Sequence, residues 1–148
     1  MGEIVVEKSL EVEAPALAIW EEMMKVSSWP EWKPFMKKAG VSGYDSLTCG
    51  AKIKMSVMVG GSASVPLSAT VIEFNRPERL VWEGGVKGLF HAVHSFDFKS
   101  MGDKTRVTSR EEFNGVLTGV VQLMVTKDDL ERLHEQWLIA IKKRMERE

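Results

Sequence analysis

Between Ile4 and Val12, most apolar residues fall on one face of an extended segment (Ile4, Val6, Leu10 and Val12), and the opposite face carries Val5, Glu7, Ser9 and Glu11. This period of two predicts a strand. Pro15 suits the first turn of a helix, and apolar residues follow it at helical spacing as far as about Lys25. The chain is therefore predicted to open with a strand and then a helix.

The segment SSWPEWKPF, at residues 27–35, gathers aromatic side chains directly after that helix. Ser28 and Glu31 have the spacing of a capping box, which predicts a helix of one or two turns. Residues three apart in such a helix share one side. The aromatic residues on that side are Trp29, Trp32 and Phe35.

The middle of the chain alternates apolar and polar residues over short stretches that are separated by turn signals. The alternation covers residues 53–59 and 90–98, and it predicts strands with one covered and one wet face. An antiparallel meander is the simplest arrangement of such strands. The turn signals are Gly60–Ser62, Asn75–Pro77, Gly84–Gly85 and Gly102–Lys104.

Apolar residues return to helical spacing near the C-terminus, where basic residues also gather. A long helix with one apolar face must bury that face, and the covered side of the sheet is its natural partner. We therefore predict an α+β domain in which a curved antiparallel sheet wraps around a C-terminal helix. The apolar face consists of Leu130, Leu133, Trp137, Leu138, Ile141 and Met145.

Composition narrows the class of protein without identifying a function. The chain has 148 residues, of which 44% are hydrophobic and 28% charged, and this suits one globular domain over residues 1–148. The formal net charge of -1 offers no general attraction for nucleic acid or for an anionic lipid surface. No nucleic-acid partner is therefore expected.

Other sequence features bear on location. Cys49 is the only cysteine, which excludes an intrachain disulfide and fits a reducing compartment. No stretch approaches the roughly 20 apolar residues of a membrane span, and the acidic N-terminal residues do not form a signal segment. We expect a cytoplasmic protein without a membrane span.

Several short motifs follow one another along the chain: EAPALAIW, WPEWKPF, RPERLVW, HSFDFK with GDKTRVTSREEF, and the closing amphipathic helix. Taken together, they resemble the START-like, helix-grip superfamily known as SRPBCC, particularly its bacterial polyketide cyclase/dehydrase-type members. The resemblance covers essentially the whole chain. Glu13 and Lys33 depart from the family pattern, in which small or amide residues are commoner at these positions.

This resemblance implies a seven-stranded antiparallel sheet that grips the C-terminal helix, with two small helices after the first strand. It also implies an internal apolar cavity, which we place between the sheet and residues 117–145. Members of the superfamily include lipid carriers, hormone-type receptors, aromatase/cyclases and chaperone regulators, so the fold alone does not specify a reaction.

Aromatic and thioether side chains that face such a cavity would supply apolar contact to a hydrophobic ligand. Aromatic residues at helical spacing equally fill a core, and Met23, Met24, Met55, Met58 and Met124 fit either role. The residues that we assign to ligand contact are Trp29, Trp32, Phe35, Met55, Trp82, Phe90, His94, Phe96, Glu111 and Trp137.

His94 shares its predicted strand face with phenylalanines. On the next strand, Ser109 and Glu111 share a face with apolar residues, so strand alternation points all three polar side chains inward. Buried together, an imidazole and a carboxylate can shuttle protons, because burial moves both pKa values towards neutrality. The same groups can equally form a structural hydrogen-bonded cluster.

The remaining chemistry-bearing residues give no site by sequence spacing. His91 is on the opposite strand face from His94, and His134 stands beside the apolar helix stripe. No Asp, Glu or Cys lies at ligand spacing near a second His, so we predict no metal site and no cofactor. Cys49 has no local base or helix start that would lower its pKa, which argues against a nucleophile.

Three functions remain open from the sequence. The first is the binding or carriage of a small hydrophobic ligand, such as a lipid, an isoprenoid or a polyketide-like molecule. The second is a cyclase/dehydrase-type enzyme with His94 and Glu111 as acid and base. The third is a chaperone-regulator-like module that binds another protein through its outer sheet face. The protein is expected to be a monomer or a homodimer.

Overall fold

The sheet accounts for most of the regular structure. A computed structural model describes residues 3–43, 46–58 and 64–147. The strands in these ranges are β1 (Glu3–Val12), β2 (Met36–Ser42), β3 (Lys52–Met58), β4 (Ser64–Asn75), β5 (Arg79–Val86), β6 (Phe90–Met101) and β7 (Lys104–Asn114). They form one antiparallel sheet in the order β1-β7-β6-β5-β4-β3-β2, so the first and last strands of the chain are neighbours.

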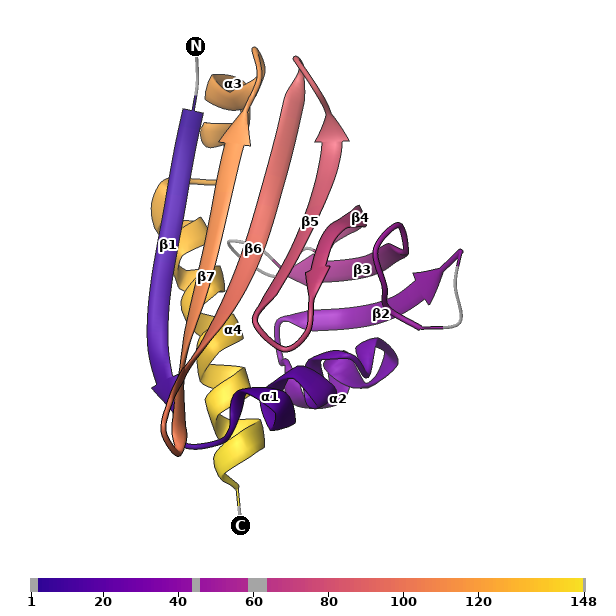
Figure 1. The fold of residues 1–148 in the computed structure, drawn as a ribbon. Coiled ribbons are helices and arrows are strands. Elements are labelled where there is room, and N and C mark those ends of the chain that lie inside the picture. The colour runs from indigo at the N-terminus through magenta and orange to yellow at the C-terminus, as the bar shows by residue number, and fades with distance from the viewer. Residues whose placement is uncertain (1–2, 44–45, 59–63, 148) are drawn as a thin grey trace.

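The helices are α1 (Ala16–Met23), the short 3₁₀ turn η1 (Val26–Ser28), α2 (Trp29–Trp32), α3 (Thr118–Gln122) and α4 (Lys127–Glu146). Figure 1 shows α4 running along one face of the sheet, with α1 and α2 beside its C-terminal half. The predicted α+β helix-grip architecture is confirmed. The capping box belongs to α4, where Thr126 and Asp129 bond each other's backbone N–H, whereas the Ser28 hydroxyl donates to the carbonyl oxygen of Lys25.

Two of the predicted turns are confirmed, at Asn75–Pro77 between β4 and β5 and at Gly102–Lys104 between β6 and β7. The turn predicted at Gly84–Gly85 is wrong, because both glycines lie inside β5. Gly85 has a φ of +88°, and a Cβ on it would overlap the carbonyl oxygen of Phe90 on β6. The glycine therefore serves a close approach of two strands. The turn predicted at Gly60–Ser62 lies outside the described residues.

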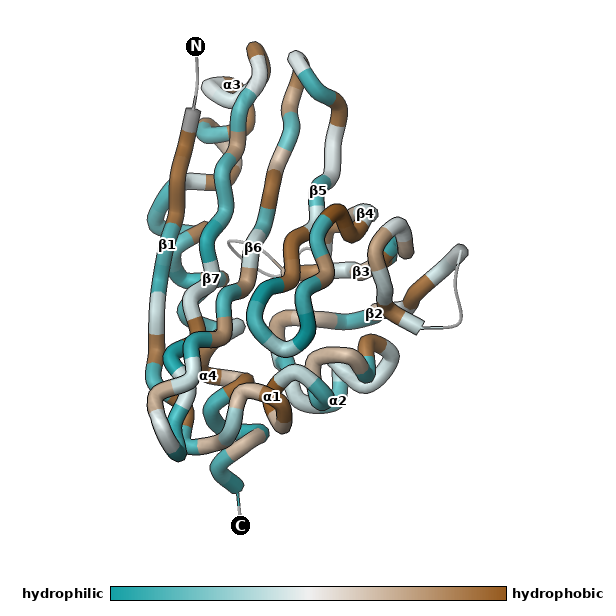
Figure 2. The backbone as a smooth tube through the Cα atoms, viewed as in Figure 1, coloured by the Kyte–Doolittle hydropathy of each residue, from teal (hydrophilic) through white to brown (hydrophobic). Residues whose placement is uncertain are grey.

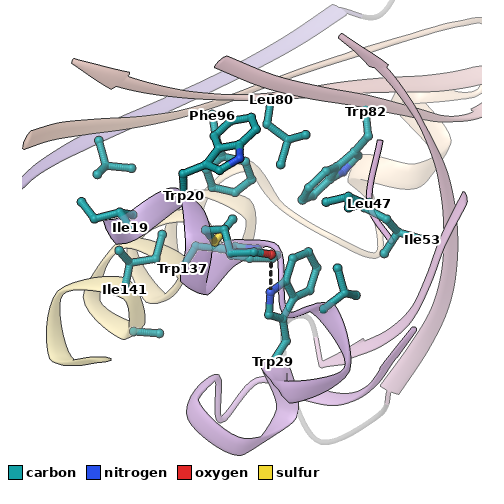
Figure 3. Close-up of a cluster of buried hydrophobic side chains, with 14 of the residues drawn as sticks. Ile19, Trp20, Trp29, Leu47, Ile53, Leu80, Trp82, Phe96, Trp137 and Ile141 are labelled. Atoms are coloured by element: carbon teal, nitrogen blue, oxygen red, sulfur yellow. Dashed lines mark hydrogen bonds between the residues drawn. The ribbon is translucent and has the colours of Figure 1, made fainter. Parts of the chain in front are cut away.

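Buried apolar side chains form two separate clusters, both between the sheet and the helices. The larger cluster surrounds Trp20, Phe96 and Trp137, and Figure 3 shows its rings gathered from strands and helices. The smaller cluster lies nearer the start of α4 and consists of Ile4, Val6, Phe113 and Leu130. Figure 2 shows how hydrophobic and hydrophilic residues alternate along β6, and how the C-terminal end of α4 is hydrophilic.

Candidate functional site

Aromatic side chains fill the space between β5, β6 and the middle of α4. The ring of Trp137 lies 5.2 Å from that of Phe96 and 6.0 Å from that of Trp82, measured between centroids. Trp29 meets Trp137 at 5.3 Å, and its Nε1 donates a hydrogen bond of 3.1 Å to the carbonyl oxygen of Met23 (Figure 3). These four candidates for ligand contact are therefore packed on one another, in the space where we expected the ligand.

Two further candidates also have protein neighbours. Phe90 stacks on Phe113 with 5.8 Å between ring centroids, beside the smaller apolar cluster. Met55 is buried in the larger cluster. The sequence alternation placed both side chains correctly on covered strand faces, and protein side chains contact them there.

A layer of polar side chains separates the two apolar clusters. It consists of His94 from β6, Ser109 and Glu111 from β7, and His134 from α4. The continuous register of β6 and β7 pairs His94 directly with Glu111, so no bulge disturbs the inward orientation that alternation predicted. His94, Ser109 and Glu111 do lie together, as their strand positions indicated. His134 joins them from α4, which sequence spacing did not indicate.

Hydrogen bonds run through this polar layer from one strand to the helix and back. Ser109 Oγ lies 2.8 Å from Nε2 of His94 and 2.8 Å from Nδ1 of His134. The other nitrogen of His134, Nε2, lies 2.9 Å from Oε1 of Glu111. Nδ1 of His94 faces the same carboxylate oxygen at 3.9 Å. One hydroxyl and one carboxylate thus connect both imidazoles.

The imidazoles of the polar layer are held away from water. His134 and Ser109 have no exposed surface, His94 is 5% exposed, and Glu111 is the most exposed member of the layer, with 16% of its side chain exposed. Burial lowers the pKa of His94 well below its usual value, and the nearby His134 and Lys33 lower it further. His94 is therefore neutral at physiological pH, with one ring nitrogen available as an acceptor.

Lys33 is a second residue, after His134, that sequence reasoning did not place in the site. It has no exposed surface, although it follows α2 in a short loop. Its Nζ lies 3.5 Å from the ring centroid of Trp137, 4.0 Å from that of Trp29 and 4.5 Å from that of Trp32. The described residues place no carboxylate within ion-pair distance of it. The three aromatic neighbours, together with the departure from the family pattern at this position, were the available signals.

The amine of Lys33 is unusual because its surroundings offer little to stabilise a charge. Its one hydrogen-bonding contact in the described residues is to Sδ of Met23, at 3.6 Å. Burial lowers the pKa of Lys33 well below its usual value. Burial therefore disfavours the charged form, whereas its position over three tryptophan rings offers cation–π attraction to that form.

A cleft of about 530 Å³ opens on the side of α4 that is turned towards α2 and the end of β3. The backbone N–H of Met58 donates to the carbonyl oxygen of Phe35 at 2.8 Å and fixes one wall. The polar residues at the cleft are Asp129, Arg132, Gln136 and Lys143. Its larger apolar side chains are Trp32, Phe35, Met58, Leu133 and Ile139. Of the ten predicted ligand contacts, Trp32 and Phe35 line this cleft.

Exposed apolar side chains gather at the opposite end of the sheet, around α3. Leu123 and Met124 are 86% and 82% exposed, and Val116 and Val120 are also largely exposed. The backbone N–H of Leu117 bonds the carbonyl oxygen of Leu89 at 2.9 Å, which joins this segment to the β5–β6 turn. We call this surface the α3 patch. It is the feature that a protein-binding module would need.

Comparison with known proteins gives a family. Residues 3–146 match the model of a family described as polyketide cyclase / dehydrase and lipid transport. The chain belongs to this family. No curated protein gives a significant match. No helix in the described part of the chain is long and apolar enough to span a membrane.

Solved structures share the fold at low sequence identity. A START superfamily protein from Mycobacterium smegmatis is 18% identical, with a TM-score of 0.78 over 98% of both chains. The Zhui aromatase/cyclase from Streptomyces sp. R1128 is 17% identical, with a TM-score of 0.78 over 99% of this chain and 95% of its own. Truncated norcoclaurine synthase from Thalictrum flavum is 18% identical, with a TM-score of 0.73 over 99% and 96%. These likenesses describe the fold.

Proposed function

We propose that the protein binds a small hydrophobic ligand in the cleft between α2, the end of β3 and α4. The observation that carries this proposal is the cleft itself, whose volume of about 530 Å³ lies within the roughly 300–1,000 Å³ of small-molecule sites. Its walls are mainly apolar, with aromatic surface from Trp32 and Phe35. Membership of a family described by lipid transport as well as cyclase chemistry is consistent with such a ligand.

Polar groups at the rim suit a ligand with a polar end. Arg132 is already paired with Asp129 at 2.8 Å, and Asp129 also caps α4. Gln136 and Lys143 lie on the same stripe of the helix, and the described residues place no carboxylate in ion-pair contact with Lys143. A ligand with an apolar body and an acidic or hydrogen-bonding end group fits this distribution.

Catalysis by His94 and Glu111 on a ligand in this cleft has less support. Neither residue, nor Ser109 or His134, lines the cleft. An acid or base must come within hydrogen-bond reach of the reacting atoms, directly or through one water. Binding is therefore the better-supported of the two functions that the family description suggests.

Nile red, an uncharged dye whose fluorescence rises in apolar surroundings, provides a binding test. Ile139 lines the cleft and is 46% exposed, so Ile139→Asp can be made at little cost in stability. A carboxylate in the apolar wall should weaken Nile red binding by about tenfold or more. The matched control is Leu17→Asp on α1, because Leu17 is 44% exposed and lies off the cleft. The control should change the affinity by less than about twofold.

The protein-binding alternative gives a different outcome in the same titration. Exposed apolar side chains on the α3 patch also attract an uncharged dye. Dye bound there would be lost in Leu123→Asp and retained in Ile139→Asp. That result would contradict the ligand cleft and would support the α3 patch as the functional surface.

A further inference from the structure

Three potential ligand atoms converge inside the polar layer, away from the proposed ligand cleft. His94, His134 and Glu111 each offer one ligand atom, and these atoms all lie within 4.8 Å of one another. Nδ1 of His94 and Nε2 of His134 are the nitrogens that face Oε1 of Glu111. The side chains come from β6, α4 and β7, which are packed together and hold them in place. Two imidazoles and one carboxylate form a donor set that proteins use for divalent transition metals.

Ser109 fixes which nitrogen of each histidine faces the centre of this group. Its Oγ lies 2.8 Å from Nε2 of His94 and 2.8 Å from Nδ1 of His134. A serine oxygen has two acceptor lone pairs, so it can accept an N–H from both rings at once. In that arrangement Nδ1 of His94 and Nε2 of His134 are both unprotonated. Hydrogen bonds to the outer nitrogen of metal-binding histidines have this orienting role.

The group then lacks a positive charge at its centre. Two nitrogen lone pairs and a carboxylate oxygen then face one another in a largely water-excluded layer, and these are atom types that bind divalent cations. A hydrogen bond across the 2.9 Å between Nε2 of His134 and Oε1 of Glu111 pairs only two of these three atoms. A proton there leaves Nδ1 of His94 at 3.9 Å from the carboxylate, beyond hydrogen-bond distance. A metal ion satisfies all three atoms.

We propose that His94, His134 and Glu111 bind a divalent transition-metal ion, with Zn²⁺ the best match to two imidazoles and one carboxylate. Zinc takes nitrogen and oxygen ligands at about 2.0–2.2 Å, so ligand atoms roughly 3–3.5 Å apart surround it. Nε2 of His134 and Oε1 of Glu111, at 2.9 Å, already approximate this spacing. Nδ1 of His94 lies 3.9 Å from the same oxygen, and this distance must shorten by less than about 1 Å. Three protein ligands leave a fourth position open.

The site is separate from the ligand cleft, because none of its residues lines that cleft. The metal site and the proposed ligand binding can therefore be tested independently of each other. A metal ion here would tie β6, β7 and α4 together across the boundary between the two apolar clusters. Since a structural site rarely exists in the unfolded chain, the ion would also stabilise the fold.

Metal titration tests the site directly. The protein carries Cys49→Ser throughout, because the exposed thiol is a competing zinc ligand. After treatment with EDTA, it is titrated with ZnCl₂ in a calorimeter, and with CoCl₂ to record visible absorption. We expect one equivalent of Zn²⁺ with a Kd below about 1 μM, and a Co²⁺ spectrum typical of low coordination number.

Variants assign the ligands. Glu111→Gln keeps the shape of the side chain and removes its charge, so it should weaken Zn²⁺ binding by about 100-fold or more. Ser109→Ala should weaken it by about 10–100-fold through loss of orientation. His91→Gln is the matched control, because His91 also pairs with a glutamate, Glu83 at 3.0 Å, on the opposite face of β6. The affinity of His91→Gln for Zn²⁺ should stay within about twofold of that of the protein with His91 intact.

If Glu111→Gln does not fold, the imidazole ¹⁵N signals of the protein with all its proposed ligands intact test the metal site instead. Zn²⁺ should shift Nδ1 of His94 and Nε2 of His134, while the nitrogens facing Ser109 keep their protons. A Kd above about 100 μM would overturn the proposal. A loss of Zn²⁺ binding in His91→Gln as large as that in Glu111→Gln would also overturn it. Imidazole ¹⁵N signals that Zn²⁺ leaves unchanged would overturn it as well, because they would show that no metal ion binds these nitrogens.

Discussion

The face of α4 that packs on the sheet is closed, whereas the face turned towards α2 and β3 is hollowed into a cleft. On the sheet side, His134 and Trp137 have almost no exposed surface and contact side chains of β5, β6 and β7. On the other side, Leu133 and Ile139 line an open space of about 530 Å³. Both faces are rich in apolar residues, so hydrophobicity alone does not distinguish a filled core from a binding site.

What distinguishes the faces is whether the opposing side chains reach the helix and fill the space beside it. On the sheet side, large rings from two strands and α2 reach across and meet Trp137. On the cleft side, the opposing wall ends at Trp32 and Phe35, and no described side chain fills the gap. Lys33 lies between the two regions, in contact with Trp137 on one side and Trp32 on the other.

The largest effect should follow from opening the closed face. Trp137→Ala removes the ring that touches Trp29, Phe35, Trp82 and Phe96, and should lower the free energy of unfolding by about 3–5 kcal/mol. Urea denaturation measures this change. A loss below about 1 kcal/mol would mean that the sheet side of α4 is as loosely packed as the cleft side.

A smaller loss is expected from the polar layer. Ser109→Ala leaves a nitrogen of His94 and one of His134 without their shared partner, and each buried unpaired group costs about 1–3 kcal/mol. The control Ser9→Ala breaks an exposed hydroxyl pair with Thr108 and should cost about 0.5 kcal/mol or less. Equal unfolding free energies for the two variants would show that the layer is open to water.

Replacing Lys33 should change the free energy of unfolding least, and it should raise this free energy rather than lower it. Lys33→Met keeps the shape and removes a buried amine, so it should raise the free energy of unfolding by about 1–2 kcal/mol at pH 6. Because the folded state lowers the pKa of Lys33, the unfolded chain binds more protons between that lowered pKa and a pH of roughly 10, and wild-type stability rises with pH in this range.

The gain from Lys33→Met should therefore shrink as the pH is raised from 6 towards about 9.5. Urea titrations of both proteins at these two pH values measure it. A variant that is less stable than wild type at pH 6 would show instead that Lys33 is a caged cation held by three tryptophans.

Much of the fold followed from periodicity. Strand alternation placed His94 and Glu111 inward, and the continuous register of β6 and β7 confirms it. Helical spacing predicted that α4 packs on the sheet. The turn signal at Gly84–Gly85 was misleading, because both glycines lie inside β5, where Gly84 approaches the backbone of β4 and Gly85 that of β6. A pattern along one segment does not report such contacts.

The sites were harder to predict, because they depend on which elements meet. His134 and Glu111 are 23 positions apart, yet their side chains lie 2.9 Å from each other. No spacing rule for metal ligands covers that separation, so the metal site that we propose has no signal in the sequence. Leu133 belongs to the predicted apolar stripe of α4, and it lines the cleft as well as packing against the larger apolar cluster. Burial of Lys33 contradicts the ordinary exposure of lysine.

Occupancy of the cleft is tested most directly by NMR of the methionine methyl groups, labelled with ¹³C, during a titration with Nile red. Met58 lines the cleft, whereas Met23 is buried beside Lys33 and Met55 lies within the larger apolar cluster. The Met58 signal should shift most, while those of Met23 and Met55 stay nearly constant. A shift at Met55 with Met58 unchanged would contradict the cleft, and would place the ligand beneath the sheet instead.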